Sequence, residues 1–429
     1  MKGAKHLVVY VTLQSGQALM PTKRFGKVRR LLKEKKAKVI RWCPFTIKLL
    51  YETETSIVQD VVLGVDTGSK NIGVSCVGND KVLYQSQVVI RTDIKKNMDK
   101  RRSFRRNRRN RKTRYRPPRF LNRKNSTKLN RLPPSVRHKV QAHIDEIEFC
   151  KKILPIAKIV LEVSQFDTAL MKNPTLISEK VRRWGYQKGF NYGYSSRRAA
   201  VLHRDKYTCQ ICGAKHTRLE VHHIIFRSKG GTDDEKNLIT LCEDCHAAIH
   251  AGKITLTKKP KKMNLKHATH MSIIRSQLLK KYPEAIETFG FVTKENRNNL
   301  RLPKNHYIDA CVIASAGKSF IPSDEIYYKR RVAKGDYQLC KGSRGEVKLP
   351  VGKIQGFRKF DKVGYLGKTY FIKARMSSGY AALMDIFNEK ADFSHMPKGY
   401  KTPKLKNLKR LAARTSVLCV RENIIADIA

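Results

Sequence analysis

Two cysteine pairs of the form Cys-x-x-Cys constrain this chain more than any other feature. Cys209 and Cys212 form the first pair, and Cys242 and Cys245 form the second. Four thiolates presented by two turns at this spacing are typical of a tetrahedral structural zinc site, which is closed to substrate. Metal binding of about 10–16 kcal/mol can hold together a module with few apolar residues. The sequence therefore predicts a zinc-stabilised module within 187–256, and the part from Gln187 to Cys245 has its own composition.

The histidines near these cysteines are placed for a second task. His222 and His223 are adjacent on a predicted strand, Leu219–Ile225, so their side chains point to opposite faces. One can bind a metal ion while the other acts as a general base. His246 and His250 are four residues apart on a helix predicted to begin after the second cysteine pair, and share a face. A strand, a turn and a helix would bring His222 and His246 to one ion. The alternative is a zinc module in which the histidines have no chemical task.

The charge of the chain predicts a polyanionic partner. Its 429 residues include 90 Lys and Arg against 35 Asp and Glu, for a net charge of +55. Repulsion on this scale disfavours a compact state unless a polyanion neutralises it. Nucleic acid is the expected partner, with strongly salt-dependent binding. By charge alone, a basic ribosomal-type protein is the alternative.

The sequence also predicts where the protein works. No apolar run approaches the ~20 residues of a membrane span, and the short apolar stretch in His6–Leu13 is predicted to be a strand rather than a signal peptide. Six further cysteines are scattered, which favours a reducing cytosol over a disulfide framework. We therefore expect a cytoplasmic, nucleoid-associated protein without a membrane partner.

An arginine-rich segment interrupts the apolar part of the chain. The range 95–116 contains 13 basic residues and one acid, and a helix here would be polar all round. Such a helix is stable between phosphates that contact it on every side; a solvated or localisation-type basic run is the alternative. A second basic helix is predicted near Gly26–Lys36. The predicted nucleic-acid contacts are Lys23, Arg24, Arg101, Arg102, Arg105, Arg106, Arg108 and Arg109.

Three acids lie on otherwise apolar elements outside the predicted zinc module. Asp66 ends an apolar strand, Glu162 lies in the strand "KIVLEV", and Asp309 follows His306 on the first turn of a predicted helix. A buried carboxylate is costly unless it is paired or bound to metal. The three acids could converge on a two-metal phosphodiesterase site, with ions about 3.5–4 Å apart. For Asp66, capping of a turn is the alternative.

The order His-His, Asn, His between and after the cysteine pairs resembles the HNH, or ββα-metal, nuclease family. This resemblance implies that His223 deprotonates water and that His222 and His246 hold one Mg²⁺ on the scissile phosphate. It implies that Asn237 positions the loop. Some family members also use a histidine at the place of His250, which is therefore a candidate ligand.

The segments around the three acids resemble a split RuvC-type RNase H fold. This resemblance implies that Asp66, Glu162 and Asp309 hold two Mg²⁺, and that His306 transfers a proton or contacts phosphate. The HNH-like insert lies between the second and third segments. The complete order resembles the IscB family, transposon-encoded nucleases related to the type II CRISPR effectors. "ALMPTKRFGKVRRLL" resembles their PLMP module, with Ala18 at the first proline.

The resemblance implies an α/β multidomain fold. Its parts are a split RNase H-like (RuvC) domain, an inserted zinc-ribbon ββα-metal HNH domain, an arginine-rich bridge helix, a small N-terminal module and a β-rich C-terminal domain. The expected ranges are 1–56 for the N-terminal module, 57–94, 121–186 and 257–322 for the RuvC-like segments, 95–120 for the bridge helix, 187–256 for the HNH domain with structural Zn²⁺, and 323–429 for the C-terminal domain.

The implied function is RNA-guided cleavage of DNA. A non-coding guide, the omega RNA, would select double-stranded DNA by base pairing, and the C-terminal domain would read a short adjacent motif. The HNH site would cut the guide-paired strand and the RuvC-like site the displaced strand. The protein would be a monomer within its ribonucleoprotein. The alternatives are an unguided homing or restriction-type HNH endonuclease, which leaves the three acids unexplained, and a non-catalytic zinc-containing RNA-binding protein.

Overall fold

The computed structural model describes residues 8–53, 58–110, 131–167, 170–171, 190–229, 231–256, 265–333, 352–397 and 400–424, except the side chains of 107–110. The chain separates into two compact units. Unit 1 comprises Met1–Gln165 and His270–Ala429, and unit 2 comprises Phe166–Thr269. The expected insert, 187–256, lies within unit 2. No helix of the described residues is long and apolar enough to cross a membrane.

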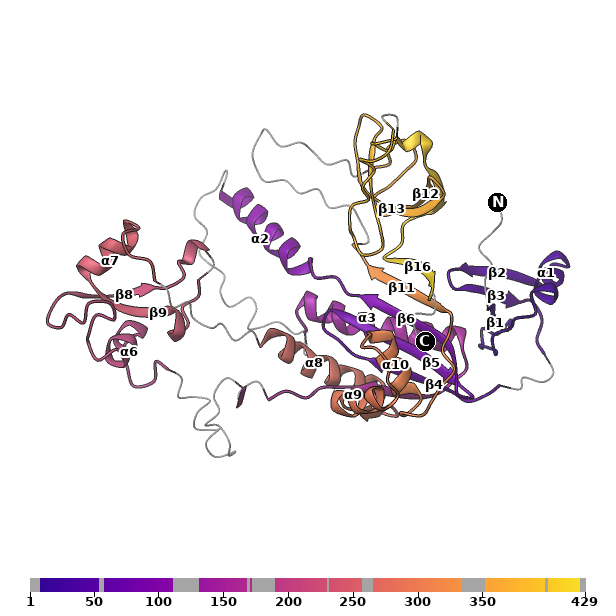
Figure 1. Cartoon of the computed structure of the whole chain (residues 1–429), viewed down its shortest axis with the longest axis horizontal. Coiled ribbons are helices and arrows are strands. Elements are labelled where there is room, and N and C mark those ends of the chain that lie inside the picture. The colour runs from indigo at the N-terminus through magenta and orange to yellow at the C-terminus, as the bar shows by residue number, and fades with distance from the viewer. Residues whose placement is uncertain are drawn as a thin grey trace. The chain divides into compact units, whose positions relative to one another are not determined.

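Unit 1 is built on a seven-stranded sheet of order β10-β7-β4-β5-β6-β11-β16 (Figure 1). The three strands expected between 61 and 89 are confirmed as an antiparallel meander, and β7 lies parallel to β4 on the other side. The last two strands in this order, β11 and the edge strand β16, come from beyond residue 322, so part of the expected C-terminal domain completes this sheet. The strands are β4 Val61–Asp66, β5 Asn71–Gly78, β6 Lys81–Val89, β7 Ile156–Glu162, β10 Ile286–Thr288, β11 Glu325–Arg331 and β16 Val417–Asn423.

Alternate residues of β4 face two different layers of helix. Leu63 and Val65 are fully buried in a core that also contains residues of α3 (Pro134–Ile153) and α8 (Lys266–Lys281). Gly64 faces the opposite layer, where α10 (His306–Ala314) packs on the sheet (Figure 1). The pleat of a strand places residues two apart on one side. Asp66 is therefore on the same side as α10.

Two glycines allow α10 to lie unusually close to the sheet. A Cβ atom on Gly64 would lie 2.3 Å from the carbonyl oxygen of Ala310, and one on Gly73 would lie 1.8 Å from that of His306. Both contacts are with helix backbone, which a rotamer change cannot relieve. Glycine at these two positions therefore lets α10 lie against the sheet along its length, from His306 to Ala314.

The N-terminal residues form a small sheet of order β1-β3-β2. The expected strand His6–Leu13 is shorter within the described residues, where β1 covers Tyr10–Thr12. The expected helix near Gly26–Lys36 ends earlier, because Lys35 has a φ of 56° that a helix cannot continue. The elements are α1 Phe25–Lys33, β2 Ala37–Trp42 and β3 Phe45–Leu49.

The C-terminal residues form a second sheet with its own apolar core, in the order β14-β13-β12-β15. Its strands are antiparallel, as a β-rich region joined by short turns predicts. They are β12 Lys362–Tyr365, β13 Lys368–Arg375, β14 Ala381–Met384 and β15 Lys409–Ala412.

Unit 2 contains a two-stranded antiparallel sheet and short helices. The expected strand over Leu219–Ile225 is β8, Leu219–His223, and it pairs with β9, Leu238–Cys242. The expectation that the following helix begins after Cys245 is wrong, since α7 covers Glu243–His250 and Cys245 lies in its first turn. Helix α6, Arg197–Arg204, precedes the sheet, and Ser196 caps it by accepting a hydrogen bond from the Ala199 N–H.

Candidate functional sites

The two cysteine pairs of unit 2 come together as their spacing predicts. The Sγ atoms of Cys209, Cys212, Cys242 and Cys245 all lie within 4.8 Å of one another. Cys209 begins a tight turn, in which its N–H donates to Ala214. Cys242 and Cys245 span the junction of β9 and α7. Four thiols at this separation fit one tetrahedral zinc ion.

Three histidines form a second cluster in the same unit. Ligand nitrogens of His222, His246 and His250 all lie within 4.8 Å of one another, so His250 joins the pair that the sequence singled out. His222 is 3% exposed, and its Nε2 atom has no hydrogen-bond partner among the described residues. Burial and the neighbouring histidines lower the pKa of His222 to about 4. A neutral imidazole with an unpaired buried nitrogen fits a metal ligand.

Glu220 orients one of these histidines and was missed by the sequence analysis. Its Oε2 atom lies 3.0 Å from Nδ1 of His246. A carboxylate that accepts from one ring nitrogen fixes the tautomer and turns the other nitrogen toward a metal. The alternation of β8 contains the signal, because Glu220 and His222 are two residues apart and share a face.

His223 points away from this cluster and has a different partner. Its Nε2 atom lies 2.8 Å from Oδ1 of Asp233. Asp233 also accepts hydrogen bonds from Nε and Nη2 of Arg227, at 3.0 and 2.7 Å. The hydrogen bonds from His223 and Arg227 lower the pKa of Asp233. An imidazole held by an ionised carboxylate is the arrangement of an oriented general base. Asp233 was not predicted from the sequence.

Asn237 closes the loop that follows His223 and contains Asp233. Its Oδ1 atom accepts from the Ile225 N–H at 2.9 Å, and its Nδ2 atom donates to the carbonyl oxygens of Ile225 and Thr232 at 3.1 and 2.7 Å. The side chain is 3% exposed. One amide thus satisfies three backbone groups across the loop between β8 and β9.

In unit 1, two of the three predicted acids lie side by side at one sheet edge. Asp66 ends β4, Glu162 ends β7, and the two residues are register partners on these parallel strands. His306, on the first turn of α10, places Nδ1 2.6 Å from Oδ2 of Asp66. Its Nε2 atom lies 3.3 Å from Nδ2 of Asn71. The carboxyl ends of parallel strands are where open sheets bind ligands.

The electrostatics of this edge are those of crowded carboxylates. Burial raises the pKa of Asp66, although its hydrogen bond with His306 opposes the rise. Burial and the nearby charge of Asp66 raise the pKa of Glu162 to about 7. Asp309 raises the pKa of both. Like charges held together in a poorly solvated site favour bound protons or bound cations.

Helix α9 (Gly290–Asn299) contributes two side chains that the sequence analysis missed. Arg297, 7% exposed, places a guanidinium nitrogen 2.5 Å from Oδ1 of Asp309. One turn earlier, Thr293 donates a hydrogen bond to Glu162, which lowers the pKa of that carboxyl. The spacing of four residues puts both on one helix face. A single face of α9 therefore contacts two of the three acids.

The carboxylates are less closely gathered than the other two clusters. Within the described part of the chain, the sets of three or more ligand atoms that all lie within 4.8 Å of one another are the cysteine set and the histidine set. Asp66, Glu162 and Asp309 do not form such a set.

The predicted nucleic-acid contacts are exposed where the structure describes them. Helix α2 covers Ile94–Asn110. The side chains of Arg108 and Arg109 lie outside the described residues. Lys23 and Arg24 are exposed immediately before α1. The exposed arginines of α2 are Arg101, Arg102, Arg105 and Arg106.

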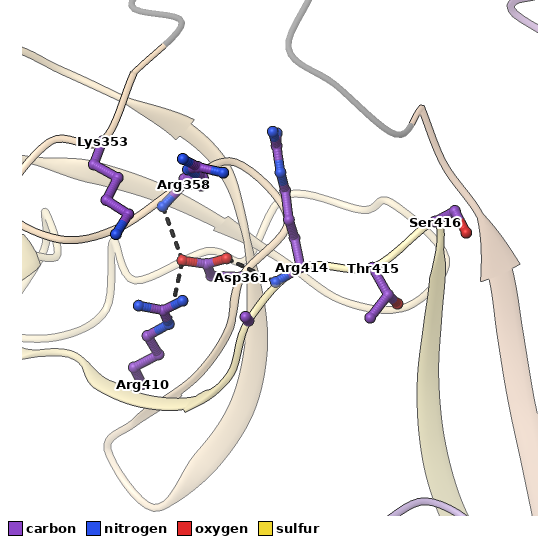
Figure 2. A pocket seen from close by; sticks show the side chains of 8 residues that line it. Lys353, Arg358, Asp361, Arg410, Arg414, Thr415 and Ser416 are labelled. Atoms are coloured by element: carbon purple, nitrogen blue, oxygen red, sulfur yellow. Dashed lines mark hydrogen bonds and ion pairs between the residues drawn. The ribbon is translucent and has the colours of Figure 1, made fainter. Parts of the chain in front are cut away.

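A basic pocket in the C-terminal part of unit 1 was not predicted (Figure 2). It has a volume of about 410 Å³. Asp361 is fully buried there and accepts hydrogen bonds from the backbone N–H groups of Arg358 and Arg414, at 2.9 and 2.8 Å. This carboxylate joins two distant segments of the chain, and its Oδ2 atom also lies 3.5 Å from Nε of Arg410. Four of the residues that line the pocket are cationic. The lining residues are Lys353, Arg358, Asp361, Arg410, Ala413, Arg414, Thr415 and Ser416.

Comparison with known families matches two parts of the chain. Residues 9–189 match the family described as RRXRR protein, and residues 209–252 match the family described as HNH endonuclease. The first match contains β4, α2 and β7, and the second contains both metal-ligand clusters of unit 2.

Individual relatives match shorter stretches. Anaredoxin of Nostoc sp. is 31% identical over 65 residues, which are 15% of this chain and 86% of that protein. The type IV methyl-directed restriction enzyme EcoKMcrA of Escherichia coli is 36% identical over 64 residues, 13% of this chain and 23% of the enzyme.

Among solved structures, two of Streptococcus thermophilus Cas9, in complex with the AGAA PAM and with AGGA PAM, are similar to this chain. Both have a TM-score of 0.30, at 12% and 13% identity. The similarity covers 56% of this chain and 32% of Cas9. The RRXRR region and the HNH endonuclease domain together support a DNA endonuclease similar to the IscB/Cas9-like nucleases.

Proposed function

We propose that this endonuclease is RNA-guided and cuts the two DNA strands at two separate centres. One observation carries the proposal. An oriented histidine beside a histidine cluster lies in unit 2, and a set of crowded carboxylates lies at a sheet edge in unit 1. Each centre has its own general-base or metal-binding groups, and neither borrows a described side chain from the other unit. A net charge of +55 supplies the affinity for nucleic acid.

In the HNH domain, we assign the water-activating step to His223. A ring protonated at Nε2 donates to Asp233 and leaves Nδ1 to accept a proton from water. His222, His246 and His250 would hold one divalent ion, which we assign as Mg²⁺ and which would act as a Lewis acid on the scissile phosphate. Asn237 would hold the loop that follows His223 in place. The four cysteines would hold a structural Zn²⁺ that supports β9 and α7, in the manner of a zinc ribbon.

In unit 1, we assign the second centre to Asp66, Glu162 and Asp309. The order β6-β5-β4-β7-β10, with β4 and β7 parallel, supports a split RNase H-like, or RuvC-like, domain. The carboxylates fit two Mg²⁺, which would neutralise charge on the attacking and leaving oxygens. His306 is placed to hold or move a proton at Nε2, because its Nδ1 is engaged by Asp66.

The remaining partners follow from the basic surfaces. We propose that the exposed arginines of α2, as a bridge helix, contact the backbone of an omega RNA guide and of the paired DNA. The basic pocket around Asp361 would accept a backbone phosphate, in a domain that contacts the motif beside the target. The protein would act as a monomer in a cytoplasmic, nucleoid-associated ribonucleoprotein. We propose the domain boundaries expected from the sequence, except that β11 and β16 belong to the RuvC-like sheet and not to the C-terminal domain.

Strand-specific nicking tests the two-centre proposal. The protein is purified with its own bound RNA, that RNA is sequenced, and a supercoiled target matching its variable end is offered with Mg²⁺. We expect His223→Ala to cut only the displaced strand and Asp66→Ala to cut only the guide-paired strand. Loss of an oriented general base should slow cutting of the DNA strand that it acts on by about 10²–10⁴-fold.

Two outcomes would contradict the proposal. If either substitution abolishes both cuts, the centres are not independent. If RNA-free protein cuts one fixed site with equal efficiency, the unguided HNH endonuclease is the correct function. A Lys294→Ala variant, exposed on α9, serves as the control and should cut both strands.

A further inference from the structure

Two cysteines outside the zinc cluster lie in contact although they are 376 positions apart. The Sγ atoms of Cys43 and Cys419 are separated by 3.1 Å. Cys43 lies between β2 and β3 of the N-terminal sheet, and Cys419 lies on the edge strand β16 of the large sheet. Neither residue is used by the proposed cleavage chemistry. The contact is between two sheets whose strands are not paired with each other.

Non-covalent contacts already seat the N-terminal sheet on the core of unit 1. The hydroxyl of Tyr10 donates to the carbonyl oxygen of Leu83 at 2.9 Å. The guanidinium carbon of Arg41 lies 4.5 Å from the centre of the Phe149 ring. The two thiols therefore meet at a packed junction, where little chain movement is needed to join them.

The surroundings of Cys43 favour its thiolate. Its hydrogen bond with Cys419 and the nearby cations of Lys362, Lys329 and Arg421 lower the pKa of Cys43 to about 7, against the opposing effect of burial. Lys362 is anchored there, since its ammonium donates to the carbonyl oxygen of Cys419 at 3.2 Å. Cys43 is half-buried rather than sealed. A partly exposed thiol beside fixed cations is the environment of a reactive cysteine.

We propose that Cys43 and Cys419 are a redox modification site that a peroxide converts to a disulfide, tying the N-terminal sheet to β16. The Cys43 thiolate attacks one peroxide oxygen, the O–O bond breaks, and hydroxide leaves as a sulfenic acid forms. The Cys419 thiol then attacks the Cys43 sulfur, the S–S bond forms, and the S–O bond breaks to release water. The two sulfurs together lose two electrons. The hydroxide takes up the proton that Cys43 released when it ionised, so one peroxide is reduced to two molecules of water. A thiol reductant reverses the change.

A second cysteine pair in the same unit provides an internal control. Cys76 and Cys150 are hydrogen-bonded to each other and fully buried in the main core. Proximity alone would link both pairs. Access for peroxide and thiolate character distinguish Cys43–Cys419 from the buried pair, which should stay reduced.

Peptide mapping of the full-length protein tests the proposal. The zinc-loaded protein is treated with hydrogen peroxide at equimolar amounts, free thiols are alkylated, and the chain is digested with trypsin without reductant. We expect a linked pair of the peptides 42–48 and 415–421, whose yield rises with peroxide and disappears after dithiothreitol. The buried pair, in the peptides 71–81 and 140–151, should be recovered alkylated after unfolding.

Matched serine variants complete the test. Cys43→Ser and Cys419→Ser should each abolish the linked peptide. Their thermal unfolding midpoints should not respond to peroxide, whereas that of the wild type should rise. The proposal is overturned if both thiols remain alkylatable after treatment, if Cys43 oxidises to sulfinic acid without linking, or if the bond forms only between two chains. None of these outcomes depends on whether the protein cuts DNA.

Discussion

The Nδ1 atom of His306 lies 2.6 Å from Oδ2 of Asp66, although the two residues are 240 positions apart. The contact joins the first turn of α10 to the end of β4. Asp66 raises the pKa of His306 through this hydrogen bond. Such a short bond requires α10 to approach the sheet more closely than side chains on the strands would allow. The glycines of β4 and β5 supply that approach.

Gly73→Ala should therefore damage both unit 1 and its carboxylate centre. The added Cβ would lie 1.8 Å from the carbonyl oxygen of His306, so α10 must move. Overpacking of this kind typically costs about 1–3 kcal/mol, and we expect loss of displaced-strand cutting with the guide-paired strand still cut. Urea unfolding and strand-resolved cleavage measure the two effects. Gly26→Ala in α1, where a Cβ meets nothing within 4 Å, should be neutral or stabilising. Wild-type stability and cutting in Gly73→Ala would contradict this account.

Arg297 should also be needed for cutting of the displaced DNA strand. Its guanidinium donates a hydrogen bond to Oδ1 of Asp309, so it orients that carboxylate. Removing a residue that orients a ligand typically lowers metal affinity or activity by about 10–100-fold. We expect Arg297→Ala to slow displaced-strand cutting by this factor and to raise the Mg²⁺ concentration needed for it. Lys294→Ala, on the same helix but exposed, is the control. Equal slowing of both strands would show that Arg297 acts on the protein as a whole.

The members of these clusters could be predicted from the sequence more readily than the residues that contact them. Cys-x-x-Cys pairs, adjacent histidines and acids on apolar strands are local patterns, and each was found from its spacing. Asp233 and Arg297 were missed because their partners, His223 and Asp309, are reached through a loop and through helix packing. In a chain with 90 Lys and Arg, one arginine carries no signal. The burial of Arg297 does indicate a special role, but burial depends on tertiary structure and cannot be read from the sequence.

The sheets show the same limit. Alternation and turn residues predicted β4, β5 and β6, whose pairing is local. Nothing in the sequence indicated that β11 would lie parallel to β6, or that β16 would pair with β11 across nearly ninety intervening residues. Buried ion pairs on β11 contribute to that choice, since Lys329 places its ammonium 2.6 Å from Oε2 of Glu146 on α3.

Removing the zinc ion should destabilise unit 2 without destabilising unit 1. We expect one Zn²⁺ in the wild type and none in Cys242→Ser, because the remaining thiols cannot complete a tetrahedral site. Unit 2 should then become sensitive to protease while unit 1 stays resistant, since the cysteine cluster belongs to the small apolar core of unit 2. Metal analysis and limited proteolysis report the two results. Cys43→Ser should keep its zinc, and a zinc-free but protease-resistant Cys242→Ser would refute the structural assignment.

His143 predicts how unit 1 responds to acid. The ring is fully buried, with Nδ1 2.8 Å from the Lys139 carbonyl oxygen and Nε2 accepting from the Gly68 N–H at 3.3 Å. Burial lowers the pKa of His143 to about 4, below about 6.5 for an unfolded chain. Protons therefore bind preferentially to the unfolded state between these values. The neutral ring makes its full contribution to the free energy of unfolding above about pH 6.5. This contribution declines toward pH 4, by about 3 kcal/mol in total.

Urea unfolding at pH 7.5 and pH 5 checks this expectation. His143→Gln keeps an acceptor for Gly68 but cannot titrate, so it should lose less stability than the wild type between the two pH values. His395→Gln, at an exposed position, should behave like the wild type. An unchanged pH dependence in His143→Gln would rule out the buried neutral ring as a source of acid sensitivity.

Salt dependence should reveal whether the basic pocket around Asp361 binds a phosphate. The anchoring bonds from Arg358 and Arg414 to Asp361 come from backbone N–H groups, so Arg358→Ala removes a cation without removing the anchor. Losing one phosphate contact reduces the slope of log affinity against log salt by about 1. We expect this change in Arg358→Ala, measured with short duplex DNA and with single-stranded RNA. The probe whose salt slope changes more identifies the nucleic acid that the pocket binds. Lys406→Ala, exposed and outside the pocket, should keep the wild-type slope, and an equal slope in all three proteins would exclude a phosphate from the pocket.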